Sequence, residues 1–120
     1  MSTRLQGLRT VIYAAPDLES AKRWWSDFVG TAPYFDEPYY VGFNPGGYEL
    51  GLVPDVDPAE GALVYWGVAD VVAAVSEACG LSAIEHIAPS DVGGGIITAS
   101  VRTPDGNVVG FIHNPHFVLA

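Results

Sequence analysis

The strongest constraint on this chain is a pattern that occurs twice: a strand, a helix and then three strands. An apolar run rich in Val, Ile and Tyr precedes Asp17, and a similar run precedes Asp70, 53 positions further on. Aspartate is a favourable helix N-cap, and the apolar spacing of an amphipathic helix follows both residues. Short strand-like segments separated by Pro- and Gly-rich turns complete each half. The sequence therefore predicts a duplicated βαβββ unit.

The expected elements divide into two halves. In the first half we expect strands over residues 8–15, 34–35, 39–44 and 48–53, and a helix after Asp17 that ends at Gly30. In the second half we expect strands over 62–68, 83–88, 96–102 and 107–113, and a helix after Asp70 that ends at Gly80. Residues 89–95 are predicted as a turn. The fold class is α+β: one domain over residues 1–120, with module one at about 8–54 and module two at about 62–115.

Composition excludes several classes of partner. Fourteen acidic residues against five basic ones give a net charge of −9, which disfavours binding to nucleic acids and anionic membranes. The lone cysteine, Cys79, excludes an intrachain disulfide, and its helical pattern predicts a small buried side chain. The N-terminal residues do not resemble a signal peptide, and no window approaches the ~18 apolar residues of a membrane span. We therefore expect a cytoplasmic protein.

Two phrases at the expected helix start and last turn resemble those of a known superfamily. The segments APDLESAKRWW and TPDGNVVGFIHNP, set within the repeat, resemble the vicinal oxygen chelate superfamily of glyoxalase I, bleomycin-resistance proteins and extradiol dioxygenases. The resemblance implies two βαβββ modules whose sheets curl around a shared cavity, and often a homodimer. It also implies a divalent metal that is held by four residues on four strands and acts as a Lewis acid.

The four ligand positions that the resemblance implies carry unsuitable residues here. They fall on Thr10, Glu49, Leu63 and Gly110. Only Glu49 offers a good ligand, and a single carboxylate does not hold a divalent ion firmly against water. We therefore expect no metal and no other cofactor. His86, His113 and His116 are interpreted as surface or capping residues, and the role of His86 stays open.

Period-two alternation predicts the lining of the cavity that the resemblance implies. It places Ile12 with Thr10, and Tyr65 with Leu63, while Trp66 points toward the helix. The resulting interior is mostly apolar with a few polar groups, which is typical of a ligand site. The expected ligand-binding residues are Thr10, Ile12, Tyr39, Glu49, Leu63, Tyr65 and Gly110, with Glu49 as the candidate catalytic group.

Three classes of function remain at this point. The first is a metal-free protein that binds an apolar or aromatic small molecule bearing a cation or hydrogen-bond donor. The second is a lyase, isomerase or dioxygenase of the same superfamily that uses Glu49 or a metal site located elsewhere. The third is a structural dimer without a ligand, and the apolar tail Phe117-Val118-Leu119 is a candidate contact for a homodimer.

Overall fold

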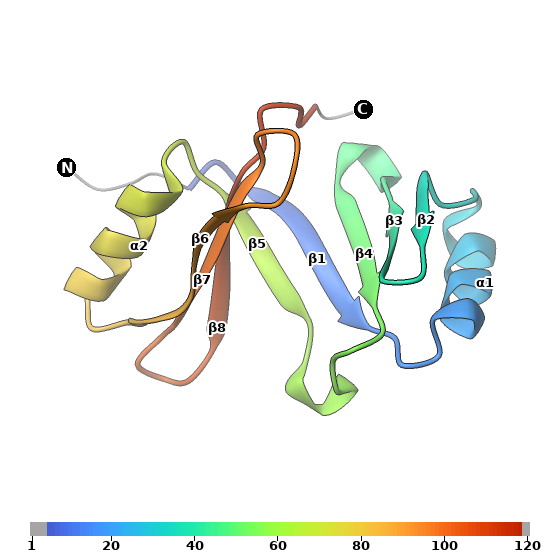
Figure 1. The fold of residues 1–120 in the computed structure, drawn as a ribbon, viewed down its shortest axis with the longest axis horizontal. Helices are drawn as coiled ribbons and strands as arrows, with labels where there is room; N and C mark the ends of the chain where they lie inside the picture. Colours follow the sequence, from blue (N-terminus) through green and yellow to red (C-terminus); the bar gives the residue numbers. More distant parts are fainter. Residues whose placement is uncertain (1–4, 119–120) are drawn as a thin grey trace. The chain divides into compact units, whose positions relative to one another are not determined.

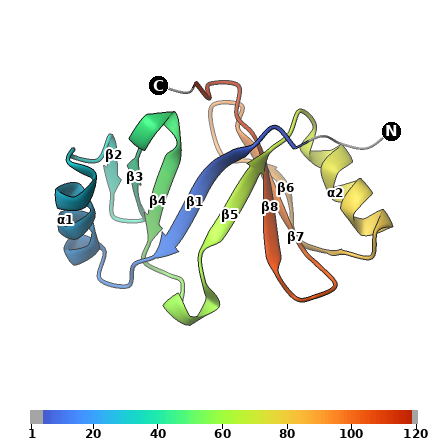
Figure 2. The same ribbon diagram turned by 180° about the vertical axis from the view of Figure 1, so that it is seen from behind.

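The computed structural model describes residues 5–118, which form two compact units. The first unit comprises residues 10–63 with Val118, and the second comprises residues 64–117 with residues 5–9. Each unit contains one helix and a four-stranded mixed sheet (Figures 1 and 2). This confirms the α+β class and the order strand, helix, three strands in both halves.

The first unit carries the strand order β2-β3-β4-β1. Its elements are β1 (Leu8–Ala14), α1 (Leu18–Val29), β2 (Phe35–Glu37), β3 (Tyr40–Phe43) and β4 (Glu49–Val53), with 3₁₀ turns at Pro45–Gly47 and Pro58–Glu60. Strands β2, β3 and β4 pair antiparallel, whereas β1 pairs parallel with β4. The first two residues of β1 lie in the second unit.

The second unit repeats this arrangement with the order β6-β7-β8-β5. Its elements are β5 (Leu63–Gly67), α2 (Val71–Gly80), β6 (Ile84–Asp91), β7 (Ile97–Arg102) and β8 (Val108–His113). Strand β5 pairs parallel with β8, and β6, β7 and β8 pair antiparallel. The parallel strand therefore follows the same rule in both units: the strand before the helix pairs with the last strand.

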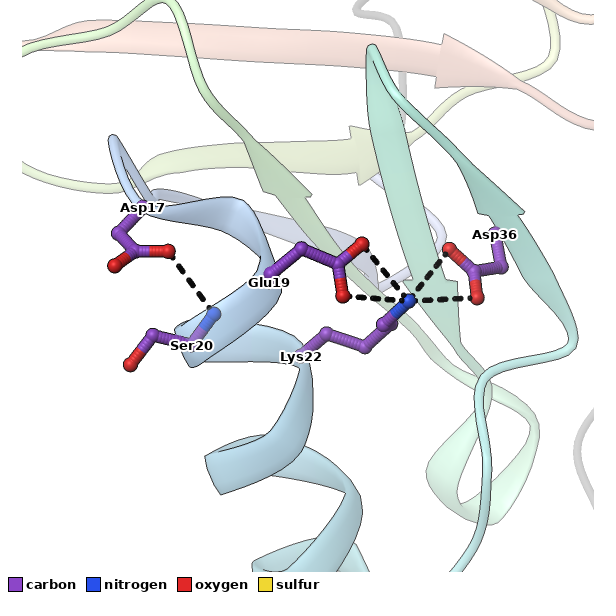
Figure 3. Close-up of polar contacts among 5 residues, drawn as sticks. All are labelled: Asp17, Glu19, Ser20, Lys22 and Asp36. Atoms are coloured by element: carbon purple, nitrogen blue, oxygen red, sulfur yellow. Dashed lines mark hydrogen bonds and ion pairs between the residues drawn. The ribbon is translucent and has the colours of Figure 1, made fainter.

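Both helices begin as the sequence predicts. Oδ1 of Asp17 accepts a hydrogen bond from the Ser20 backbone N–H at 3.1 Å, and Oδ1 of Asp70 accepts one from Ala73 at 3.0 Å. These caps satisfy backbone donors that the first turn of a helix leaves free. Figure 3 shows the cap at Asp17 and, beside it, Lys22 of α1 bridging Glu19 and Asp36 of β2.

Each helix covers an apolar face of its own sheet. In the first unit Val41, Phe43, Leu50 and Leu52 are buried, and Trp25 of α1 packs against them. In the second unit the buried residues are Val68, Val71, Ala74, Val75, Ala99, Val101 and Phe111. Alternation along the strands leaves Glu49 and Gly51 on the opposite face of the first sheet, and Tyr65 and Gly110 on the opposite face of the second.

Two expectations are wrong. Cys79 is exposed rather than buried, because it lies near the end of α2 while the buried side of that helix is formed by Val71, Ala74 and Val75. The segment predicted as a turn begins inside β6, which extends through Pro89 to Asp91. Strand β6 is an edge strand that pairs only with β7 and has register shifts, so it tolerates a proline.

Neither α1 nor α2, nor any other helix within residues 5–118, is long and apolar enough to cross a membrane.

The core of the first unit generates a stability prediction. Leu52 is fully buried, so Leu52→Ala removes apolar contacts and leaves a cavity, and we expect it to lower the free energy of unfolding by about 2–5 kcal/mol. Leu81→Ala is the matched control, because Leu81 is 75% exposed and its loss should change stability by no more than about 0.5 kcal/mol. Urea unfolding followed by circular dichroism measures both, and equal losses would contradict the described core.

Candidate functional site

Glu49 is the centre of a hydrogen-bonded group on the face of the first sheet that α1 does not cover. The Tyr34 hydroxyl donates to Oε1 of Glu49 at 2.5 Å, and the Tyr40 hydroxyl donates to Oε2 at 2.5 Å. Each carboxylate oxygen therefore already accepts one O–H group. Charge-assisted hydrogen bonds of this kind are about twice as strong as neutral ones, so they fix the direction of the carboxylate.

Two strand glycines make room for the tyrosine rings. A methyl group at Gly42 would lie 3.1 Å from Cε1 of Tyr34 and 2.9 Å from Oε2 of Glu49. At Gly51, a methyl group would lie 2.6 Å from Cζ of Tyr40. Gly42 and Gly51 are direct partners across β3 and β4. Without side chains at these two positions, both rings lie against the sheet, and their hydroxyls meet at Glu49.

The parallel pairing of β1 with β4 brings two further predicted residues to this site. Thr10 is opposite Glu49 and is buried, and Ile12 is opposite Gly51. Residues opposite each other on neighbouring strands share a face of the sheet. The structure thus places Thr10, Ile12 and Glu49 on the face predicted from alternation.

Tyr39 is not one of the tyrosines that donate to Glu49 in the described part of the chain. It precedes β3, is 65% exposed, and its ring contacts the ring of Phe35 with centroids 6.2 Å apart. The neighbouring residue, Tyr40, is the one that reaches Glu49, because Tyr40 shares the face of Gly42. Leu63 begins β5 and is half-buried.

Sequence reasoning missed Tyr34 and Tyr40 as partners of Glu49. A signal was present in the strand glycines, because a glycine inside a strand often marks the close approach of another group. Two such glycines at Gly42 and Gly51, in a segment rich in tyrosine, indicate that aromatic rings lie over the strands.

The remaining two predicted residues, Tyr65 and Gly110, form a separate contact in the second unit. They are direct partners on β5 and β8, and Cε1 of Tyr65 lies 2.7 Å from where a methyl group at Gly110 would be. The Tyr65 ring therefore lies over Gly110. Burial raises the pKa of the Tyr65 hydroxyl, so it stays a hydrogen-bond donor at neutral pH.

The residues around Glu49 do not fit a divalent metal ion. Such an ion needs several oxygen or nitrogen ligands, whereas this group supplies one carboxylate, Glu49, beside two phenol hydroxyls that donate to it. Within residues 5–118, no three His, Cys, Asp or Glu side chains come together in a group that could hold a metal. Of the three histidines, His116 contacts the Gly94 carbonyl at 2.7 Å through Nε2, His86 is exposed, and His113 is on the face opposite to Gly110.

Comparison with solved structures shows the fold. The chain superimposes on homoprotocatechuate 2,3-dioxygenase from Brevibacterium fuscum with a TM-score of 0.76 and 14% identity, over 98% of this chain and 34% of that one. For the Mn(II)-bound glyoxalase from Novosphingobium aromaticivorans the TM-score is 0.74 with 16% identity, over 93% of this chain and 40% of that one. Methylmalonyl-CoA epimerase from Mycobacterium tuberculosis gives 0.71 with 15% identity, over 94% and 91%. This is the vicinal oxygen chelate fold.

The sequence comparisons add nothing to this result, because no family model and no curated protein match the chain. The chain spans less than half the length of the glyoxalase and of the dioxygenase. The three proteins are named for different reactions, and a shared fold does not determine a reaction. The fold therefore leaves the reaction open.

The contact between Tyr34 and Glu49 generates a pH prediction. The side chain of Tyr34 is 58% exposed, but its partial burial raises the pKa of the hydroxyl, and the hydrogen bond to Glu49 raises it further. The folded protein therefore favours the neutral phenol, and stability should fall as the pH rises above about 10, the ordinary tyrosine pKa in the unfolded chain. We expect a smaller fall in Tyr34→Phe, and an intermediate one in Glu49→Gln, when urea unfolding is measured from pH 8 to pH 11. Identical slopes in all three proteins would contradict the assignment.

Proposed function

We propose that this chain is a metal-free, small-molecule-binding protein of the vicinal oxygen chelate superfamily. The ligand is apolar or aromatic in bulk and carries a cation or a hydrogen-bond donor, and Glu49 is its anchor. The observation that carries the proposal is the pair of tyrosine hydroxyls that hold the Glu49 carboxylate on a face lined by Gly42, Gly51 and Ile12. A pre-oriented acceptor on a largely apolar surface is typical of a ligand site.

The charge of Glu49 supports a cationic ligand. In the part of the chain that the structure describes, both ion pairs use Lys22, so Glu49 has no cationic partner there. Each carboxylate oxygen can accept a second hydrogen bond besides the one from tyrosine. A bond from a charged donor to Glu49 would contribute about 1.5–3 kcal/mol to binding.

Aromatic rings near the site support an aromatic or cationic group in the ligand. The ring of Phe35 is within 6.4 Å, centroid to centroid, of the rings of Tyr34, Tyr39 and Tyr40. Tyr34, Phe35 and Tyr39 are also exposed. Contact of a cation or an aromatic ring with one such face is worth about 0.5–2 kcal/mol.

The same hydrogen bonds favour an anchor over a general base. A base that takes a proton turns one carboxylate oxygen into an O–H group. The neutral acid that forms is a weaker acceptor than a carboxylate, so the hydrogen bonds from Tyr34 and Tyr40 would both weaken. An anchor takes no proton, so it keeps both bonds.

The alternative is an enzyme of the same superfamily. It is supported by the names of the structures with this fold, which are a glyoxalase, an epimerase and a dioxygenase. In that case the chain is a lyase, isomerase or dioxygenase that uses Glu49 or a metal held elsewhere. Turnover of a ligand that binds at Glu49, detected by mass spectrometry, favours the enzyme, and recovery of the unchanged ligand favours the binding protein.

The homodimer implied by the resemblance stays a proposal. Trp24 and Phe28 of α1 are exposed and stack with centroids 5.1 Å apart, and exposed aromatic groups of this kind are common in protein interfaces. In the expected tail contact, Phe117 lies against Arg9 of its own chain, Val118 is exposed, and Leu119 is outside the described residues.

A ligand screen tests the role of Glu49. We expect the cation benzyltrimethylammonium to raise the Tm of the wild-type protein more than neutral benzyl alcohol does, because only the cation is attracted by the negative charge of Glu49. Glu49→Gln should remove most of this gain, since it removes the charge and keeps the size of the side chain. Thermal shift against ligand concentration is the measurement.

Asp27→Asn is the matched control for this screen. Asp27 is an exposed carboxylate on α1, which covers the other face of the sheet, so its substitution changes the net charge equally but away from the site. Its response to the cation should equal that of the wild type. Loss of the cation response in Asp27→Asn as well, or its survival in Glu49→Gln, would show that Glu49 is not the anchor.

A metal assay tests the metal-free part of the proposal. Protein purified without chelators should contain far less than one equivalent of nickel, zinc, iron or manganese by plasma mass spectrometry, because Glu49 is the one good ligand among the four implied positions. Glyoxalase activity should be absent for the same reason. A near-stoichiometric metal that is lost in Glu49→Gln would overturn the proposal and favour the enzyme.

A further inference from the structure

A second polar group lies on the second unit, on the face of its sheet that α2 does not cover. It centres on Arg9, whose guanidinium carbon is 4.0 Å from the centroid of the Phe117 ring. Its side chain also lies against Gly67, where a methyl group would be 2.7 Å from Nε and 2.9 Å from Cζ. Arg9 is thus held by an aromatic ring and by a strand position that lacks a side chain.

Within residues 5–118, most of the hydrogen-bonding capacity of Arg9 is unused. Its Nη1 group donates to the Leu8 carbonyl at 3.2 Å. Among residues 5–118, Arg9 takes part in neither ion pair, since both involve Lys22. A guanidinium has five N–H donors at its edge, and contact of its flat face with an aromatic ring leaves those edge donors free. Arg9 is therefore a positioned cation without a carboxylate partner in this part of the chain.

The neighbouring polar groups on this face are also donors. Tyr65 is two residues from Gly67 on β5, so both project to the same side. Ser100 is opposite Gly110 across β7 and β8, and its hydroxyl oxygen is buried without a hydrogen bond to the described residues. The positions of β5, β7 and β8 that alternation and pairing place on this face of the second unit contain no carboxylate: Tyr65, Gly67, Thr98, Ser100, Arg102, Val108, Gly110 and Ile112.

We propose that Arg9 and Tyr65 form an anion-binding site on the second unit that takes the carboxylate of a small aromatic acid. The edge of the guanidinium presents two parallel N–H groups that match the two oxygens of a carboxylate. The Tyr65 hydroxyl supplies a neutral donor on the same face of the sheet, and the Tyr65 ring supplies apolar contact for the aromatic part. No residue of the Glu49 group takes part, so this proposal stands independently of the function proposed above.

The proposed anion site lies on a strongly acidic protein. A chain of net charge −9 repels anions in general, and it has five basic residues in all. Of these, Lys22 is held by Glu19 and Asp36, and Arg102 donates to the Gly106 carbonyl. Binding of an anion to this protein therefore requires a positively charged group in a fixed position, and the Arg9 guanidinium is such a group.

Titration with benzoate tests the site, with benzamide as its neutral counterpart. We expect benzoate to give a saturable shift of the Arg9 Nε–H signal in ¹⁵N NMR spectra of the wild-type protein, and benzamide to give none. Arg9→Gln should weaken benzoate binding at least tenfold, measured on the signals of the Tyr65 ring. Gly67→Ala keeps every charge but displaces the Arg9 side chain, so it should weaken binding to a similar extent.

The controls separate this site from general charge and from Glu49. Arg23→Gln removes an equal charge from the exposed side of α1 and should leave benzoate affinity unchanged. Glu49→Gln should also leave it unchanged, whatever it does to cation binding. Equal weakening by Arg9→Gln and Arg23→Gln, binding of benzamide as tight as that of benzoate, or no benzoate shift at Arg9 would each overturn the proposal. Circular dichroism confirms that each variant is folded.

Discussion

The parallel pairing of β1 with β4 determines what the first unit presents on each side of its sheet. Its register sets Val11 against Leu50 beneath α1, and Thr10 against Glu49 on the other side. Since side chains alternate along a strand, burial of Leu50 and Leu52 under the helix forces Glu49 and Gly51 to the opposite face. A shift of one residue would bury the carboxylate in the apolar core. The energy of core packing therefore also fixes the position of the polar site.

The polar site depends in turn on the absence of side chains at two positions. Gly42 and Gly51 are partners across β3 and β4, and the rings of Tyr34 and Tyr40 occupy the space above them. In the second unit, strand glycines also leave room for larger side chains: the Tyr65 ring lies over Gly110, and the Arg9 side chain lies over Gly67. The groups placed there are hydrogen-bond donors rather than a carboxylate acceptor. The duplicated fold thus provides one acceptor-centred group and one donor-centred group, each on the face that its own helix leaves uncovered.

Much of the fold could be predicted from the sequence, because its signals are local. Asp17 and Asp70 cap helices as expected, and alternation placed Thr10 and Glu49 on one face. The sequence predicts Pro89 in a turn, whereas it lies in strand β6. An edge strand can contain a proline, and whether a strand is at the edge depends on the whole sheet and not on the segment itself. The cavity shared by the two modules stays a prediction from the resemblance.

The tyrosine partners of Glu49 could not be predicted in the same way. Tyr39 and Tyr40 are neighbours, and only the register of β3 decides which of them projects toward Glu49. Tyr34 precedes β2 and reaches Glu49 from fifteen residues away in the sequence. Arg9 was not expected at a site, because its place depends on contacts with Gly67 and Phe117 that are distant along the chain.

The most direct test of this account is the detection of the two tyrosine hydroxyl protons by NMR. With tyrosine labelled at Cζ and glutamate at Cδ, the account predicts two slowly exchanging hydroxyl protons, assigned to Tyr34 and Tyr40, that both show contacts to the Glu49 carboxylate. Hydroxyl protons that exchange as fast as those of an exposed tyrosine, or that show no contact to Glu49, would contradict it.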